Sequence, residues 1–382
     1  MKVLHLASFS GNSGDILNHS GFRPWFQNQI SSPIKWANFE IRDVYRGDRS
    51  FKSDLLPASA GCDLLVVGGG NYLELWPSNT STGTSLDFSP ELLDSLEVPV
   101  FFNALGVDLG QGISQIAQKN FPPFIARLQN SDQFLLSVRN DGSLKALSSL
   151  TASGVETSRI PDHGFFSKLP LSNLNFSNHR YFPKIGINIA QDMADIRFEK
   201  FGGINAFIET FVAFLVELWT ETKSTFIFFA HVKSDLLIAS QIIDQLPDKI
   251  AREFVEVAKL NSTQFGSFEM FEQYTQCDLV LANRFHSNVF AIANCIPVIG
   301  LSNYPQISNL YEEIGLTSMV ADIHEPSYAA NLVANSLQAL SGVNEIKEQL
   351  REINRTLLRE RSSFLPTLHQ WFASNQLKEK LI

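Results

Sequence analysis

The chain has 382 residues, of which 44% are hydrophobic and 18% charged, and this composition excludes a largely disordered protein. Two domains are expected at this length, since domains usually hold about 100–200 residues. The 30 lysines and arginines against 39 aspartates and glutamates leave a formal charge of −9, which argues against a protein that coats nucleic acid.

No feature of the sequence indicates export, membrane insertion or a bound metal. The three cysteines lie far apart, without metal-ligand spacing: Cys62, Cys277 and Cys295. The apolar run at residues 1–7 is too short for a secretory signal and resembles a first strand. Residues 207–219 fall short of the roughly 20 residues that span a bilayer and predict a buried helix. We expect a cytoplasmic protein that requires no metal and no cofactor.

Short apolar runs alternate with longer amphipathic stretches through most of the chain, as in a parallel sheet built from βα units. In the first half the runs that predict strands are residues 3–8, 34–41, 63–67, 98–105 and 133–138. In the second half they are residues 184–190, 224–230, 253–258, 277–283 and 296–301, with helices predicted at 203–222 and 235–246. The pattern predicts an α/β fold of two doubly wound, Rossmann-like domains.

A segment rich in Ser, Asn and Pro, residues 167–183, separates the two series and is the predicted interdomain linker. The predicted domains are therefore residues 1–175 and 184–344, followed by a helical tail at 345–382. The tail has one apolar face and a stripe of basic residues at i+4 spacing: Lys347, Arg351, Arg355 and Arg359. Such a stripe is either the solvated side of a helix or a peripheral contact with a membrane or an acidic partner.

Glycine-rich turns follow the first and third predicted strands, where doubly wound sheets bind their ligands. In Gly11-Asn-Ser-Gly-Asp15, Gly14 and Asp15 are candidates for a ligand-binding loop, and the alternative is a simple turn with Asp15 as the helix N-cap. The triplet before Asn71 includes Gly69 and Gly70, which either present amides to an oxyanion or allow two loops to touch. It matches neither a dinucleotide fingerprint nor a P-loop.

Later strands of the first half end in charged residues at the same sheet edge. Asp108 follows the fourth strand and Arg139 the fifth, although Arg139 could instead form a salt bridge with Asp141 or Asp162. His163 lies in a Pro-Asp-His-Gly turn, where it is either structural or directed at a ligand.

The sharpest candidate site follows the buried strand at 277–283, where Asn283-Arg284-Phe285-His286 opens a helix. A helix start offers unpaired amides, arginine adds a planar fork for phosphate or carboxylate, and histidine adds a proton or a hydrogen bond. The alternative is an arginine that ties two loops together beside a helix-capping histidine. His231 follows another strand at the same edge, and its ordinary interpretation is a solvent-exposed histidine.

Taken together, these segments resemble the polysaccharide pyruvyl transferase family. The resemblance covers GNSGD, VVGGGN, ALGVD, SVRNDGS and PDHG, and is most specific in the block from Cys277 to Leu316, which includes Arg284-x-His286, Pro297 and Tyr304. It implies two GT-B-like domains facing a cleft, with the acceptor on the first domain and the donor on the second.

The resemblance implies phosphoenolpyruvate as donor, and as acceptor a sugar of a cell-surface polysaccharide or of its lipid-linked precursor at the inner membrane face. The product would be a pyruvate ketal, with release of phosphate. The residues that would bind the donor are Asn283, Arg284, His286, His231 and Tyr304. Those expected on the acceptor side are Gly14, Asp15, Gly69, Gly70, Asn71, Arg139 and His163. His286 is the candidate acid, and Asp15 or Asp108 the candidate base.

The sequence departs from the family pattern after Tyr304, where Gln306 stands in place of a common lysine. This change raises the question of whether the donor differs. The alternatives are therefore a GT-B glycosyltransferase with a nucleotide-sugar donor and a non-catalytic binding module in polysaccharide assembly, since fold alone does not choose the donor.

Overall fold

The computed structural model describes residues 1–151, 157–168, 182–260, 263–325 and 327–382. These residues form two compact units. Unit 1 contains 1–10, 18–163 and 357–382, and unit 2 contains 11–17 and 164–356. Most of the predicted linker lies outside the described residues. Because residues 11–17 belong to unit 2 and residue 18 onward to unit 1, helix α1 (Ser13–Gln27) begins in unit 2 and continues in unit 1.

Unit 1 is built on a six-stranded parallel sheet with the order β2-β1-β3-β5-β7-β8. Its strands are β1 (Lys2–Ala7), β2 (Lys35–Glu40), β3 (Leu64–Gly68), β5 (Val100–Leu105), β7 (Phe134–Val138) and β8 (Ser158–Arg159). Between them lie α2 (Ile41–Tyr45), α3 (Leu56–Ser59), α4 (Pro90–Ser95), α5 (Gln115–Gln129) and α6 (Ser143–Leu150). A short parallel pair, β4 (Leu73–Glu74) and β6 (Val107–Asp108), lies outside this sheet.

Both faces of the unit 1 sheet are covered, which explains why its strands are nearly continuous apolar runs. Leu4 and Leu6 of β1 belong to a core cluster that also contains side chains of α4, α5 and α6. Val3, on the opposite face, belongs to a cluster with side chains of α1 and of α16 (Leu365–Ser374). The end of the chain thus completes the core of unit 1.

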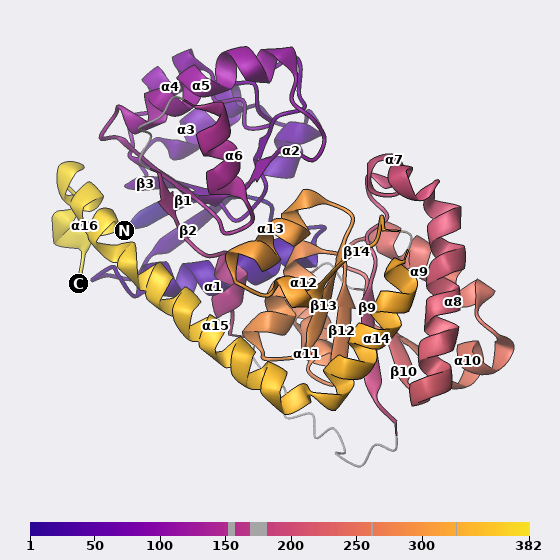
Figure 1. The fold of residues 1–382 in the computed structure, drawn as a ribbon. Helices are drawn as coiled ribbons and strands as arrows, with labels where there is room; N and C mark the ends of the chain where they lie inside the picture. The colour runs from indigo at the N-terminus through magenta and orange to yellow at the C-terminus, as the bar shows by residue number, and fades with distance from the viewer. Residues whose placement is uncertain (152–156, 169–181, 261–262, 326) are drawn as a thin grey trace. The chain divides into compact units, whose positions relative to one another are not determined.

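Unit 2 repeats the architecture with a six-stranded parallel sheet of order β11-β10-β9-β12-β13-β14. Its strands are β9 (Lys184–Asn188), β10 (Thr225–Phe228), β11 (Val255–Val257), β12 (Leu279–Ala282), β13 (Val298–Ser302) and β14 (Val320–Asp322). Its helices are α7 (Ala194–Arg197), α8 (Ile204–Thr222), α9 (Lys233–Gln245), α10 (Asp248–Glu253), α11 (Gln264–Tyr274), α12 (Phe285–Ala293), α13 (Pro305–Glu313) and α14 (Tyr328–Ser341). Helices α8, α9 and α14 lie on one side of the sheet and α11 and α12 on the other (Figure 1).

The predicted strands and the two predicted helices of the second half are all present, with ends shifted by a few residues. The tail forms two helices rather than one, α15 (Val343–Ser363) and α16, because Pro366 opens a new helix. The three arginines of the basic stripe of α15 are exposed and Lys347 is half-buried, and Arg355 pairs with Glu352 one turn earlier at 2.8 Å. No helix in the described part of the chain is both long and apolar enough to cross a membrane.

Candidate active site

Unit 2 presents its candidate residues where the strand order reverses, between β9 and β12. The chain runs from β9 toward one edge of the sheet and from β12 toward the other, so the loops after these two strands diverge and leave room for a ligand. Asn188 ends β9, and its side-chain oxygen accepts a hydrogen bond from the backbone N–H of Arg284 at 3.0 Å. This contact fixes the start of α12 at the reversal point.

Asn283 connects three strand ends and is almost completely buried. Its Oδ1 accepts a hydrogen bond from the Ala190 backbone at 3.1 Å. Its Nδ2 donates to the Leu301 carbonyl at 2.7 Å and to Asn303 Oδ1 at 2.6 Å. Asn283 therefore positions the loops of the site through its side chain.

The guanidinium of Arg284 lies between two carboxylates. Its Nε and Nη2 bind the two oxygens of Asp235 at 2.6 and 2.5 Å, and Nη2 also contacts Asp192. Burial alone would lower the pKa of Arg284, but the charges of Asp235 and Asp192 raise it above its usual value. Arg284 is therefore a permanent cation that ties two loops together, which was the structural alternative for this residue.

The two carboxylates differ in their surroundings. Asp235 is fully buried and also accepts the backbone N–H of His231 at 2.9 Å, next to the start of α9. The side chain of Asp192 is 41% exposed. Burial would raise the pKa of Asp192, but the charges of Arg284 and Arg197 lower it below its usual value. Asp235 is therefore the buried partner of Arg284, whereas Asp192 is its partly solvent-exposed partner.

Arg197 is a second cation at this place. Its Nη2 lies 3.9 Å from the Asp192 carboxylate, and its Nη1 donates to Asn303 at 3.2 Å. Its guanidinium stacks on the ring of Tyr304, 4.7 Å from the centroid. The Asp192 carboxylate thus lies between two arginines that come from different elements.

His231 is buried, so the expectation of a solvent-exposed histidine is wrong. Its Nε2 lies 3.0 Å from the hydroxyls of both Tyr274 and Ser287. Burial and the nearby charges of Arg284 and His286 lower the pKa of His231 well below its usual value. His231 is therefore neutral at physiological pH.

The first turn of α1 packs against His286, which is itself buried. A Cβ atom on Gly14 would lie 2.4 Å from His286 Nδ1, so only glycine allows this approach. The neighbouring Ser13 receives a hydrogen bond from Ser267 at 3.0 Å. Asp15 lies inside the first turn of α1 and is not its N-cap, because the helix begins at Ser13. The side-chain oxygen of Asn12 accepts the hydrogen bond from the backbone N–H of Gly14.

Gly14→Ala is expected to destabilise the protein by about 1–3 kcal/mol, the usual cost of overpacking, although alanine favours a helix. The added methyl group must displace the His286 ring. Chemical denaturation would measure the stability change, and the NMR chemical shifts of the His286 ring would report its displacement. Gly342→Ala is the matched control, since its Cβ would meet its nearest atom at 3.3 Å. Equal stabilities of the two variants would show that Gly14 does not constrain His286.

In unit 1 two carboxylates face each other across the pair of short strands. Glu74 of β4 is in register with Asp108 of β6. Asp108 accepts hydrogen bonds from Asn71 Nδ2 at 2.8 Å and from the Gly110 backbone at 2.7 Å. Burial and the charge of Asp108 raise the pKa of Glu74 to about 7. Glu74 thus keeps its proton to a higher pH than an ordinary carboxyl does, a property typical of acids in acid–base sites.

Gly69 and Gly70 are in close contact with side chains of unit 1. A Cβ on Gly69 would lie 2.8 Å from Asn18 Oδ1, and one on Gly70 would lie 2.4 Å from the ring of Tyr72. Gly69 also has a φ of +90°, which disfavours other residues. Gly69 therefore allows its loop to approach α1, whereas the close contact of Gly70 is with Tyr72, two residues further along the same loop.

Arg139 and His163 belong to a buried polar network. Arg139 pairs with Asp141 at 2.5 Å and with Asp162 at 3.6 Å, so the salt-bridge alternative describes its side chain. His163 Nε2 lies 3.0 Å from Asn103 Oδ1. Burial, and to a lesser degree the charge of Arg361, lowers the pKa of His163 to about 3. Neither side chain is exposed to solvent.

Four charged residues of these clusters were absent from the sequence-based candidates: Glu74, Asp192, Arg197 and Asp235. Asp192 follows β9, and the rule that ligand residues follow strand ends could have identified it. Glu74 lies between two buried leucines, and this apolar–polar alternation could have identified it as a side chain directed away from the core. Arg197 has no comparable signal in the sequence.

Comparison with known proteins gives a family and a fold. The polysaccharide pyruvyl transferase family model matches residues 15–304, whereas none of the curated proteins is a significant match. Among solved structures, UDP-GlcNAc 2-epimerase from Neisseria meningitidis has a TM-score of 0.57 at 13% identity, covering 97% of this chain and 100% of the other. A trehalose-phosphate synthase from Burkholderia vietnamiensis has a TM-score of 0.55 at 11% identity, covering 98% and 97%.

A glycosyltransferase from Rickettsia africae has a TM-score of 0.55 at 8% identity, covering 97% of this chain and 98% of the other. Identities this low establish the fold alone, which is the GT-B glycosyltransferase type with two parallel-sheet domains and a C-terminal helical tail. The family match covers most of the chain and both units. The chain therefore belongs to the polysaccharide pyruvyl transferase family and is a transferase.

Proposed function

We propose that the protein transfers the pyruvyl group of phosphoenolpyruvate to two hydroxyls of a sugar in a cell-surface polysaccharide or its precursor. Two C–O bonds form at C2 of the donor, and the bond from C2 to the phosphate oxygen breaks. One of the two hydroxyl protons balances the methyl group formed at C3, and the other leaves with phosphate. The products are a pyruvate ketal and inorganic phosphate, and no redox step is needed.

The observation that carries this proposal is the Asp192 carboxylate between Arg284 and Arg197. Phosphoenolpyruvate brings a carboxylate and a phosphate, which suit two fixed guanidinium groups and the amides at the start of α12. Arg197, stacked on Tyr304, supplies a second cation although Gln306 replaces the lysine of the family pattern. In this proposal Asp192 takes the place of the donor's anionic group until the donor binds.

The acid and base are assigned by position. His286 protonates C3 of the donor, and Asp15 accepts the hydroxyl proton, since its segment packs in unit 2 with Gly14 in contact with His286. Asp108 is the alternative base. His231 stays neutral because of its lowered pKa and orients Ser287 and Tyr274 rather than supplying a proton. Asn283 holds the loops from which these groups project.

Titration calorimetry with phosphoenolpyruvate, UDP-GlcNAc and GDP-mannose tests the donor. We expect heat with phosphoenolpyruvate alone, and release of phosphate when a suitable lipid-linked or nucleotide-linked sugar is added. Binding of a nucleotide sugar without binding of phosphoenolpyruvate would instead identify a conventional glycosyltransferase. Binding of phosphoenolpyruvate without phosphate release from any member of the acceptor panel would favour a non-catalytic module.

Asp192→Asn is expected to increase the affinity for phosphoenolpyruvate by up to about fivefold, because a half-exposed ion pair contributes roughly 0.2–1 kcal/mol that the donor otherwise has to replace. Calorimetry at low salt measures the change. Asp195→Asn, the same substitution at an exposed position nearby, should leave the affinity unchanged. A weaker affinity in Asp192→Asn would contradict the placeholder role, since it would show that Asp192 helps to hold the arginines for the donor.

A further inference from the structure

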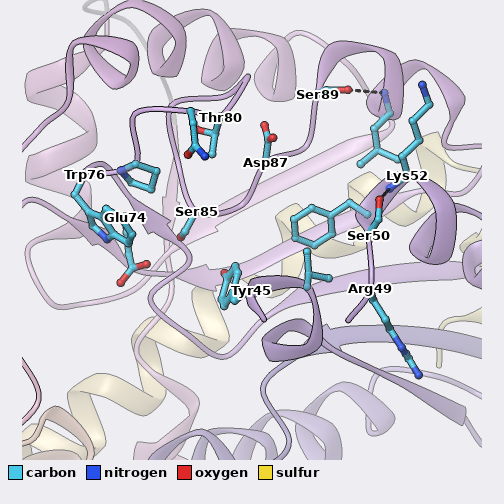
Figure 2. Close-up of a pocket in the computed structure, with 15 residues that line it drawn as sticks. Tyr45, Arg49, Ser50, Lys52, Glu74, Trp76, Thr80, Ser85, Asp87 and Ser89 are labelled. Atoms are coloured by element: carbon cyan, nitrogen blue, oxygen red, sulfur yellow. Dashed lines mark hydrogen bonds between the residues drawn. The ribbon is translucent and has the colours of Figure 1, made fainter. Parts of the chain in front are cut away.

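Unit 1 contains a pocket of about 650 Å³ whose function the strand-end residues do not explain. It lies between the loop that follows α2 and the segment from β4 to α4, and all of its lining residues belong to unit 1 (Figure 2). Its volume lies within the range of small-molecule sites, roughly 300–1,000 Å³.

Two large aromatic side chains line this pocket and remain accessible. Trp76 is 48% exposed and Tyr45 is 47% exposed, although side chains of this size are usually more buried. An aromatic ring that stays half-exposed at a pocket offers a flat apolar face and a polar edge to a ligand. The apolar C–H faces of a sugar ring fit such a surface.

Hydrogen-bonding groups surround the aromatic rings. Glu74 lies beside Trp76 in Figure 2 and has hydrogen bonds with Trp76, Ser85 and Gln111. Hydroxyl side chains contribute further donors and acceptors around the same pocket: Ser50, Thr80, Ser85 and Ser89. A ligand with many hydroxyls could exchange hydrogen bonds with this lining.

The charges at the pocket are balanced. Glu74 and Asp87 carry carboxyl groups, and Arg49 and Lys52 carry cations. Arg49 is also held by Asp43 at 3.6 Å and stacks on Phe39, so its charge is partly offset. The lining therefore offers a phosphate ester no excess of cations, whereas an uncharged polyhydroxy ligand has no unpaired charge to bury.

We infer that this pocket binds a neutral sugar ring of the acceptor glycan, with Trp76 and Tyr45 as stacking surfaces and Glu74 as a hydrogen-bonding partner. The inference rests on the proposed function, because the family name supplies the reason to expect a saccharide. It specifies a neutral sugar ring as the ligand and places it in a pocket of unit 1 that the site residues predicted from the sequence do not line.

The test is binding of methyl glycosides of glucose, galactose, mannose and N-acetylglucosamine, and of lactose, to the full chain without phosphoenolpyruvate. Calorimetry and saturation-transfer NMR should detect at least one of them. Trp76→Ala should weaken that binding about tenfold or more, and Trp76→Phe should retain most of it, as expected for stacking on an aromatic face. Phe182→Ala, at an exposed aromatic residue of unit 2, is the control and should change nothing.

The outcomes separate this inference from the proposed function. Absence of binding by every probe, or equal binding by Trp76→Ala and the natural chain, would overturn the pocket assignment even if phosphoenolpyruvate binds and phosphate is released. Sugar binding that depends on Trp76 would support the pocket assignment even if phosphoenolpyruvate fails to bind. Loss of UDP binding, rather than of sugar binding, in Trp76→Ala would show that the pocket belongs to a nucleotide.

Discussion

Arg284→Ala is expected to lower the free energy of unfolding by roughly 3–5 kcal/mol, the cost of leaving a buried charge without its partner. The Asp235 carboxylate is fully buried and receives both Nε and Nη2 of Arg284. Without the guanidinium, the hydrogen bonds that this carboxylate keeps within the described part of the chain come from backbone N–H groups at the start of α9. The same substitution should abolish measurable binding of phosphoenolpyruvate, since it also removes the proposed donor contact.

Denaturant unfolding monitored by tryptophan fluorescence measures the stability change. Arg252→Ala is the matched control because it breaks an ion pair with Asp248 in which both side chains are more than three-quarters exposed. That change should cost less than about 1 kcal/mol. If the two variants lost the same stability, Asp235 would have found solvent or another partner, and the buried-pair argument would fail.

A double variant separates the structural role of Arg284 from its role in binding. Arg284→Ala combined with Asp235→Ala removes both charges, so it should recover a large part of the stability that the single change loses. It should not recover donor binding. Recovery of both properties would place Arg284 among the purely structural residues and would contradict its proposed contact with phosphoenolpyruvate.

The fold was predictable because its signals are local. Strands covered on both faces are continuous apolar runs, so β1, β3 and β12 stand out in the sequence. The prediction omitted four short strands, β4, β6, β8 and β14, which have only two or three residues each. Their place in a sheet depends on pairing with a neighbour rather than on their own composition.

The candidate site was predictable in position but not in its contacts. Arg284 and His286 follow a buried strand, so a local pattern places them at the sheet edge. The partners that set their chemistry come from distant parts of the chain: Asp235 lies 49 residues before Arg284 and Asp192 lies 92 residues before it. No periodicity links such positions, and the packing of Gly14 on His286 depends on tertiary structure in the same way.

Glu74→Gln is expected to stabilise the protein at alkaline pH, by up to roughly 3 kcal/mol, and to have little effect at acidic pH. Burial and the charge of Asp108 raise the pKa of Glu74 from 4.5 to about 7 in the folded state. Between these two values the folded chain binds more protons than the unfolded chain. The stability contributed by Glu74 is therefore complete below the unfolded pKa and is lost as the pH rises through about 7.

Glutamine keeps the shape of the protonated acid and cannot ionise, so the difference between variant and natural chain should grow with pH. The other charged groups near Glu74 are Asp108 across the strand pair and Arg49, Lys52 and Asp87 of the pocket, and all of them stay in both proteins. Denaturant unfolding over a series of pH values gives the measurement, with the exposed Glu97→Gln as control. A Glu74→Gln difference that does not change with pH, like that of the control, would show that the pKa of Glu74 is the same in the folded and unfolded chains, and the predicted rise would be wrong.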